Sequence, residues 1–254
     1  YQVTNQKLQA IIKQVKTLAP DYILMPGDLI DTLDMVDKNS ERQRLLNFLK
    51  KLGQQSTVIL SVGNHDMYRK PTEGQTGWQY EVASKLFDEI RALDNVFLLD
   101  NQVYEDENIY CLGYTQSPKY YRADKGIVED MPVLLSELKS LPEKYLTHLP
   151  EKKLKFALIH SPVYLSQPEV KYLLREFDYF ISGHMHNGVM PPVLDELINS
   201  SRGLISPTKK WAPENSRNTL RTYADKLLVV GALTTFHECI KPFNKLNAFF
   251  PSYM

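Results

Sequence analysis

The sequence has little cysteine, no net charge and no long apolar run, and each of these absences excludes a class of protein. Two cysteines among 254 residues cannot form the disulfide framework of a small secreted domain. Basic and acidic side chains balance at 30 each, so the composition does not indicate nucleic acid or an anionic membrane as a partner. The chain also lacks the run of about 18 apolar residues that predicts a transmembrane helix. Its length suits one α/β domain with a large core.

Short apolar runs alternate with amphipathic segments along most of the chain. Leu8, Ile11 and Val15 recur at helical spacing, which predicts a helix over residues 5–18. The further predicted helices cover residues 42–52, 78–93, 132–141 and 170–177. The predicted strands cover residues 22–25, 58–61, 156–159, 179–181 and 227–230. Turn residues separate three more short runs, which predicts antiparallel strands or hairpins at residues 96–99, 102–105 and 109–114.

Four of the predicted strands lead into loops that contain aspartate, asparagine or histidine, and four of the six histidines lie there. The loops are Gly27-Asp28-Leu29-Ile30-Asp31, Gly63-Asn64-His65-Asp66, His160-Ser161-Pro162 and Gly183-His184-Met185-His186. The carboxyl ends of strands are the usual place for active-site groups in an open α/β sheet. Neutral imidazole, carboxylate and amide oxygen are ligands for first-row divalent metals. Together the loops predict a metal centre.

Each motif taken alone also has an ordinary structural explanation. Asp28 fits the cap of a turn or helix, and His160 fits a core histidine with its hydrogen bonds satisfied. Asp34 fits a loop carboxylate, whereas His148 and His237 lie outside the pattern and are interpreted as structural or surface residues. The recurrence of strand followed by ligand is what favours a shared site.

The ordered motifs G-D-x-x-D, G-N-H-D, a lone His after a strand, and G-H-x-H run from Gly27 to His186. This set resembles the calcineurin-like metallophosphoesterase family. The resemblance implies an α/β fold, a four-layer α/β/β/α sandwich of two mixed β-sheets flanked by helices. It also implies hydrolysis of a phosphomonoester or phosphodiester by a metal-activated water or hydroxide. The implied cofactors are two divalent metal ions, Mn, Fe or Zn, with Mn expected to serve in vitro.

The resemblance also implies a role for each matching residue. The implied metal ligands are Asp28, Asn64, His160, His184 and His186. A carboxylate must lie between two such cations to offset their repulsion, and Asp28 is the acidic residue in the matching position. His65 would face the leaving-group oxygen as general acid or electrostatic stabiliser. Asp31 or Asp66 would orient the His65 imidazole, as carboxylates do for histidines elsewhere.

One motif of the family is missing from this sequence. Members normally begin with a strand ending in D-x-H, and no D-x-H precedes Asp28. We therefore expect a single metallophosphoesterase domain over residues 1–254 that lacks the family's first strand. One metal site would then lack two of its ligands and keep only Asp28 and His186. The irregular segment 187–222 follows His186 directly and is predicted to be a loop that covers the cleft.

The expected substrate is a phosphorylated small molecule or lipid, and nucleic acid is not indicated. Residues 203–207 and 211–213 more weakly resemble bacterial phosphoesterases that carry an N-terminal membrane anchor. The sequence does not predict the location, which is cytoplasmic or membrane-anchored if an upstream segment exists, and it predicts no oligomeric state. The alternative function is a non-catalytic interaction module on the same fold. A structural zinc site is disfavoured because the ligands include an amide and a carboxylate rather than cysteine.

Overall fold

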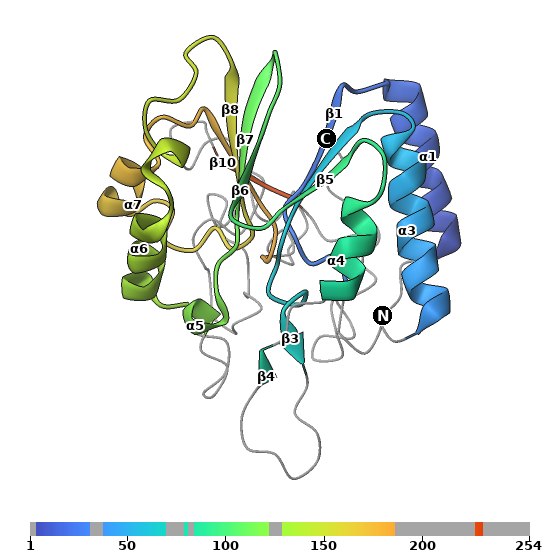
Figure 1. The fold of residues 1–254 in the computed structure, drawn as a ribbon, viewed down its shortest axis with the longest axis horizontal. Helices are drawn as coiled ribbons and strands as arrows, with labels where there is room; N and C mark the ends of the chain where they lie inside the picture. Colours follow the sequence, from blue (N-terminus) through green and yellow to red (C-terminus); the bar gives the residue numbers. More distant parts are fainter. Residues whose placement is uncertain are drawn as a thin grey trace, which may run out of the picture.

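A computed structural model of the chain describes residues 4–30, 38–69, 79–80, 84–121, 129–185 and 227–230. Strands lie between two groups of helices, with α1, α3 and α4 on one side and α5, α6 and α7 on the other (Figure 1). The helices are α1 (Asn5–Leu18), α3 (Asn39–Gly53), α4 (Ser84–Arg91), α5 (Pro118–Tyr121), α6 (Met131–Ser140) and α7 (Pro168–Leu173). No helix in these ranges is both long and apolar enough to cross a membrane.

The first sheet contains three parallel strands in the order β1-β2-β5. They are β1 (Tyr22–Met25), β2 (Thr57–Ser61) and β5 (Val96–Leu99). The prediction of an antiparallel strand or hairpin at residues 96–99 is wrong, because β5 pairs in parallel with β2, with Leu60 opposite Leu98. The helix α4 precedes β5 and packs against it, so the chain returns to the same end of the sheet before β5 begins.

The second sheet has five strands in the order β10-β9-β8-β7-β6. They are β6 (Gln102–Glu105), β7 (Ile109–Tyr114), β8 (Leu154–Ile159), β9 (Tyr179–Ser182) and β10 (Leu227–Val229). Only β6 and β7 are antiparallel here, which confirms the hairpin predicted over residues 102–114. The predicted α/β class, with two sheets and flanking helices, is confirmed. Among the described strands, only this sheet combines parallel and antiparallel pairs, since the first sheet is parallel throughout.

The helix predicted over residues 78–93 is shorter than the apolar pattern suggested. Residues Gln79–Tyr80 form a short strand, β4, which pairs antiparallel with β3 (Tyr68–Arg69). The helix α4 begins only at Ser84. The segment 187–222, predicted to cover the cleft, lies outside the described residues.

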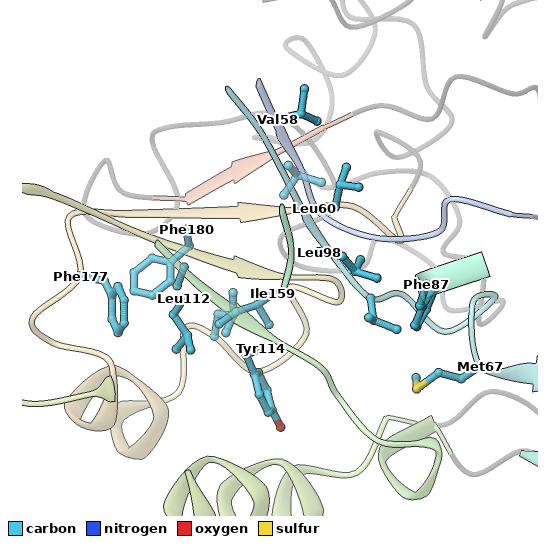
Figure 2. Packing of buried hydrophobic residues seen from close by; sticks show 14 of the residues in the cluster. Val58, Leu60, Met67, Phe87, Leu98, Leu112, Tyr114, Ile159, Phe177 and Phe180 are labelled. Carbon is cyan, nitrogen blue, oxygen red and sulfur yellow. The ribbon is translucent and has the colours of Figure 1, made fainter. Parts of the chain in front are cut away.

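Alternate side chains of the central strands enter two different cores. Val58 and Leu60 of β2 pack with Leu98 and Phe87 in the core that includes the helices (Figure 2). The residue between them, Ile59, packs with side chains of the second sheet, namely Cys111, Leu158, Ile181 and Leu228. Such alternation is expected when a sheet is covered on both faces. Each fully buried aliphatic side chain contributes about 1.5–3 kcal/mol, so the strand ends that carry the site are firmly held.

A hydrogen-bonded carboxylate joins the two sheets at the starting ends of β1 and β7. Asp106 accepts the hydroxyl hydrogens of Tyr22 at 2.7 Å and Tyr104 at 2.9 Å. It also accepts the N–H groups of Asn108 at 2.8 Å and Ile109 at 2.9 Å. Partial burial would raise the pKa of Asp106, but these donors outweigh it and lower the pKa to about 2.

Candidate metal centre

Two glycines allow the backbones of the loops after β1 and β2 to lie in direct contact. Gly27 has φ +90°, and a Cβ atom added there would lie 2.5 Å from the backbone nitrogen of Gly63. A Cβ atom on Gly63 would collide with the backbone nitrogen and Oδ1 of Asp28. Side chains larger than hydrogen would therefore push the two loops apart.

The buried carboxylate of Asp66 holds these two loops together. Its Oδ2 accepts the N–H groups of Gly63 at 2.8 Å and Asp28 at 2.9 Å. Its Oδ1 accepts the N–H groups of Leu29 at 2.9 Å and Ile30 at 3.2 Å. Both oxygens of this fully buried group are thus engaged by backbone donors. The predicted role of Asp66 in orienting His65 stays a prediction, and the contacts described here give the carboxylate a scaffolding role.

Asp28 stands at the centre of the cluster in an uncommon backbone conformation. Its φ of 56° places a non-glycine residue in the left-handed region, which is typical of functional sites. Oδ1 accepts the backbone N–H of His65 at 2.9 Å, and Oδ2 lies 3.0 Å from Nε2 of His160. Burial would raise the pKa of Asp28, but the imidazoles of His160 and His65 outweigh it and hold the pKa well below the usual carboxyl range.

His160 presents one ring nitrogen to the backbone and the other to the cluster. Nδ1 lies 2.6 Å from the carbonyl oxygen of Pro26, which can only accept, so the hydrogen of the neutral ring is on Nδ1. Nε2 then faces Oδ2 of Asp28 at 3.0 Å and Oδ1 of Asn64 at 3.1 Å. Burial would lower the pKa of His160, but the Asp28 carboxylate outweighs it and the pKa is raised. One nitrogen and two oxygen atoms, all of types that bind divalent metals, converge here.

His184 approaches the same amide oxygen from β9. Its φ of 58° is also left-handed, and its Nδ1 lies 3.0 Å from Oδ1 of Asn64. The rings of His184 and His160 are 5.3 Å apart and meet edge to face. On the far side, Nε2 of His184 lies 3.2 Å from Oε1 of Glu129. Burial lowers the pKa of His184, which favours the neutral ring that metals bind.

The structure brings together four of the five residues predicted to bind metal. They are Asp28, Asn64, His160 and His184. His65 is next to them, with its backbone bonded to Asp28 and its side chain partly exposed. His186 and Asp31 lie outside the described residues, so their predicted roles stay predictions.

Two buried residues near the site were not found from the sequence. Glu129 contacts His184 although the two are 55 positions apart. Gln116 forms two hydrogen bonds with the backbone of Ser161, at 2.7 and 3.1 Å, and so fixes the residue that follows His160. Neither residue belongs to a motif, and no local sequence pattern marks them.

The donor atoms of the cluster fit a divalent cation. Within the described ranges, no group of three or more His, Cys, Asp or Glu side chains is arranged to hold an ion by itself. The cluster adds an amide oxygen, and its nitrogen and oxygen donors are those of sites for Zn or Mn. The ion-pair partners of Asp28 and Glu129 in this part of the chain are histidines rather than Lys or Arg. Burial and the neighbouring Asp28 carboxylate raise the pKa of Asp66 to about 7, although backbone donors such as Gly63 and Ile30 act in the opposite direction.

Comparison with known families agrees with this geometry. The family model described as calcineurin-like phosphoesterase matches residues 4–188. This range covers most of the chain and all four ligand loops, so the chain belongs to the calcineurin-like phosphoesterase family, whose general chemistry is metal-dependent phosphoester hydrolysis. A search of curated proteins gave no match.

Proposed function

We propose that this chain hydrolyses a phosphomonoester or phosphodiester with two divalent metal ions, and that Mn²⁺ supports the reaction in vitro. One observation carries the proposal. Nε2 of His160 lies 3.0 Å from Oδ2 of Asp28 and 3.1 Å from Oδ1 of Asn64, and Nδ1 of His184 lies 3.0 Å from the same amide oxygen. These residues come from loops of both sheets, and together they offer the carboxylate, amide and imidazole groups that bind divalent cations.

Four side chains would hold one ion through defined atoms. These are Oδ2 of Asp28, Oδ1 of Asn64, Nε2 of His160 and Nδ1 of His184. We assign Asp28 also to the second ion, together with His186, whose assignment is based on the G-H-x-H motif alone. When bound, the ions supply the Lewis acidity that lowers the pKa of a water molecule and the charge that stabilises the phosphoryl oxygens.

We assign His65 to the leaving group. Its backbone N–H donates a hydrogen bond to Oδ1 of Asp28. The His65 side chain is therefore attached to the backbone next to the carboxylate that we propose binds both ions. The side chain is partly exposed, whereas the ligands His160 and His184 are buried, so His65 is the imidazole that a substrate can reach. A proton given by His65 to the departing oxygen would make that oxygen a better leaving group.

The alternative function, a non-catalytic module, has less support. Asp28 and Glu129 place carboxyl groups against imidazoles in a largely buried cluster, and a bound cation would offset the cost of burying their charge. A module that binds no metal has no such compensation. The substrate that we propose is a phosphorylated small molecule or lipid, because the balanced composition gives no indication of nucleic acid.

Hydrolysis of nitrophenyl phosphate and bis-nitrophenyl phosphate with added Mn²⁺ tests the proposal. The complete wild-type protein should release nitrophenol, and a chelator should stop the release. His65→Ala should lower turnover by about 10²–10⁴-fold, the usual contribution of a general acid, with Mn²⁺ binding nearly intact. His148→Asn is the matched control, because His148 is exposed, lies outside the site and has φ 57°, which Asn tolerates. Equal loss of Mn²⁺ binding in His65→Ala would overturn its assignment.

A further inference from the structure

Glu129 places a buried carboxylate against one of the proposed ligands from outside the four ligand loops. Its side chain is 1% exposed, and its Oε1 lies 3.2 Å from Nε2 of His184, which is 3% exposed. Glu129 lies just before α6, in the connection that follows α5. The contact therefore joins the helical side of the second sheet to the candidate metal centre.

The backbone around Glu129 is held in place by three hydrogen bonds. The hydroxyl of Tyr164 donates to the carbonyl oxygen of Glu129 at 3.4 Å. The next residue, Asp130, donates its N–H to the carbonyl oxygen of Tyr120 at 3.0 Å. The Asp130 side chain accepts the N–H of Val133 at 3.2 Å and so caps α6. Glu129 thus approaches His184 from a fixed position.

The two ligand histidines are held in opposite orientations by acceptors behind them. The Pro26 carbonyl oxygen takes the Nδ1 hydrogen of His160 and leaves Nε2 facing Asn64. Nε2 of His184 lies 3.2 Å from Oε1 of Glu129, and its Nδ1 faces the same amide oxygen at 3.0 Å. An ionised Glu129 carboxylate could only accept a hydrogen from Nε2. Nε2 of His160 and Nδ1 of His184 consequently face one atom, the carbonyl oxygen of Asn64.

We propose that Glu129 is a positioning residue of the metal centre, which fixes the Nε2–H tautomer of His184 and so keeps Nδ1 available to the ion. This inference rests on the proposed function. The other carboxylate oxygen, Oε2, is buried and has no hydrogen-bond partner in the described part of the chain. A backbone carbonyl such as that of Pro26 would satisfy an N–H without the cost of a buried charge. The charge is useful when a cation binds the far side of the ring, because it then raises the basicity of the ligand.

Three variants separate this role from simple packing. Glu129→Leu keeps the volume and removes the acceptor, whereas Glu129→Gln keeps an acceptor oxygen and removes the charge. Glu137→Gln is the matched control, because this half-buried carboxylate on α6 accepts hydrogen bonds from Tyr114 and Ser117 and touches no proposed ligand. Two quantities are measured: the tautomer of His184 in the metal-free protein by ¹⁵N NMR, and the Mn²⁺ dissociation constant by titration calorimetry.

A positioning role predicts a characteristic order of effects. Glu129→Leu should weaken Mn²⁺ binding by about 10–100-fold, as the loss of such partners does at other sites, and should populate the Nδ1–H tautomer of His184. Glu129→Gln should keep the Nε2–H tautomer and bind Mn²⁺ more tightly than Glu129→Leu. Glu137→Gln should leave both quantities unchanged.

Two results would overturn the inference. The first is a Glu129→Leu protein with the wild-type His184 tautomer and the wild-type Mn²⁺ affinity. The second is the Nδ1–H tautomer of His184 in Glu129→Gln, and this result can be obtained even if Glu129→Leu does not fold. Failure of the proposed function has a different signature, because it appears in the wild-type chain itself as no Mn²⁺ binding or no hydrolysis of the nitrophenyl esters. The tautomer measurement does not depend on metal, so the two failures are distinguishable.

Discussion

Oδ2 of Asp28 lies 3.0 Å from Nε2 of His160, although Asp28 follows a strand of the first sheet and His160 follows a strand of the second. The candidate metal centre therefore joins the two sheets at the carboxyl ends of β1 and β8. A cation bound between these atoms would hold both sheets at this end, as the Asp106 hydrogen bonds do at the other.

The first prediction follows from this link between the sheets. Mn²⁺ at 100 times its dissociation constant should raise the free energy of unfolding by about 2.7 kcal/mol, because it binds the folded chain alone. Asp28→Asn should lose most of this gain. Asp88→Asn is the control, since that carboxylate is 76% exposed on α4 and should leave the gain intact. Thermal melts with and without Mn²⁺ measure the effect, and an unchanged gain in Asp28→Asn would exclude Asp28 as a ligand.

The second prediction concerns Asp66. The Asp66 carboxylate accepts hydrogen bonds from four backbone N–H groups. In Asp66→Asn an NH₂ group replaces one of the two oxygens, so two of these N–H groups face a donor instead of an acceptor. Leaving two buried donors unpaired should lower the free energy of unfolding by about 2–4 kcal/mol, which urea titration measures. Mn²⁺ affinity should fall as well, because the loops that carry Asp28 and Asn64 would separate. A stability within about 0.5 kcal/mol of wild type, as expected for a surface change, would argue against this role.

The third prediction compares two glycines of the ligand loops. Gly63→Ala places a Cβ atom against the backbone and carboxylate of Asp28, whereas at Gly183 the nearest atom would be Nδ1 of His160 at 3.4 Å, an ordinary contact. Gly63→Ala should therefore weaken Mn²⁺ binding by at least tenfold and lower the melting temperature. Gly183→Ala should change both only slightly. Similar behaviour of the two variants would mean that the loops do not need their close approach.

The fourth prediction concerns the pH dependence of stability from Asp106. Its pKa of about 2 in the folded chain lies below the value of about 3.9 expected in the unfolded chain. The unfolded chain therefore takes up the proton first as pH falls, and the stabilisation is complete above about pH 5 and is lost between about pH 4 and pH 2. Because the group is partly exposed, we expect about 1 kcal/mol.

Asp106→Asn tests this assignment in urea titrations at several pH values. The difference in unfolding free energy between wild type and variant should be largest near pH 7 and should shrink as pH approaches 2. A difference that does not vary with pH would show that the charge of Asp106 contributes nothing to stability.

Much of the fold could be predicted because apolar runs report strands and helices directly. The strands at Tyr22–Met25 and Ile109–Tyr114 and the helix at Asn5–Leu18 have the predicted bounds. The direction of β5 could not be predicted, because a short buried strand has the same local pattern in parallel and antiparallel sheets. The start of α4 was misplaced because Gln79–Tyr80 pairs with β3, a tertiary contact that helical spacing does not reveal.

The meeting of the loops that carry the proposed ligands was predictable for a different reason. Each of these loops follows an apolar strand, so short sequence patterns carry the information. Glu129 and Gln116 carry no such pattern, since each acts on a residue at least 45 positions away. The backbone contacts of Asp66 were also not predicted, because its place beside His65 in the sequence suggested a role for the side chain in catalysis.

The most direct test of the proposed centre is an anomalous diffraction map of crystals grown with Mn²⁺, recorded at the manganese absorption edge. The account predicts a strong peak enclosed by Asp28, Asn64, His160 and His184. A second, weaker peak beside Asp28 and His186 agrees with the account, whereas no peak beside the four side chains under conditions in which Mn²⁺ supports hydrolysis would contradict it.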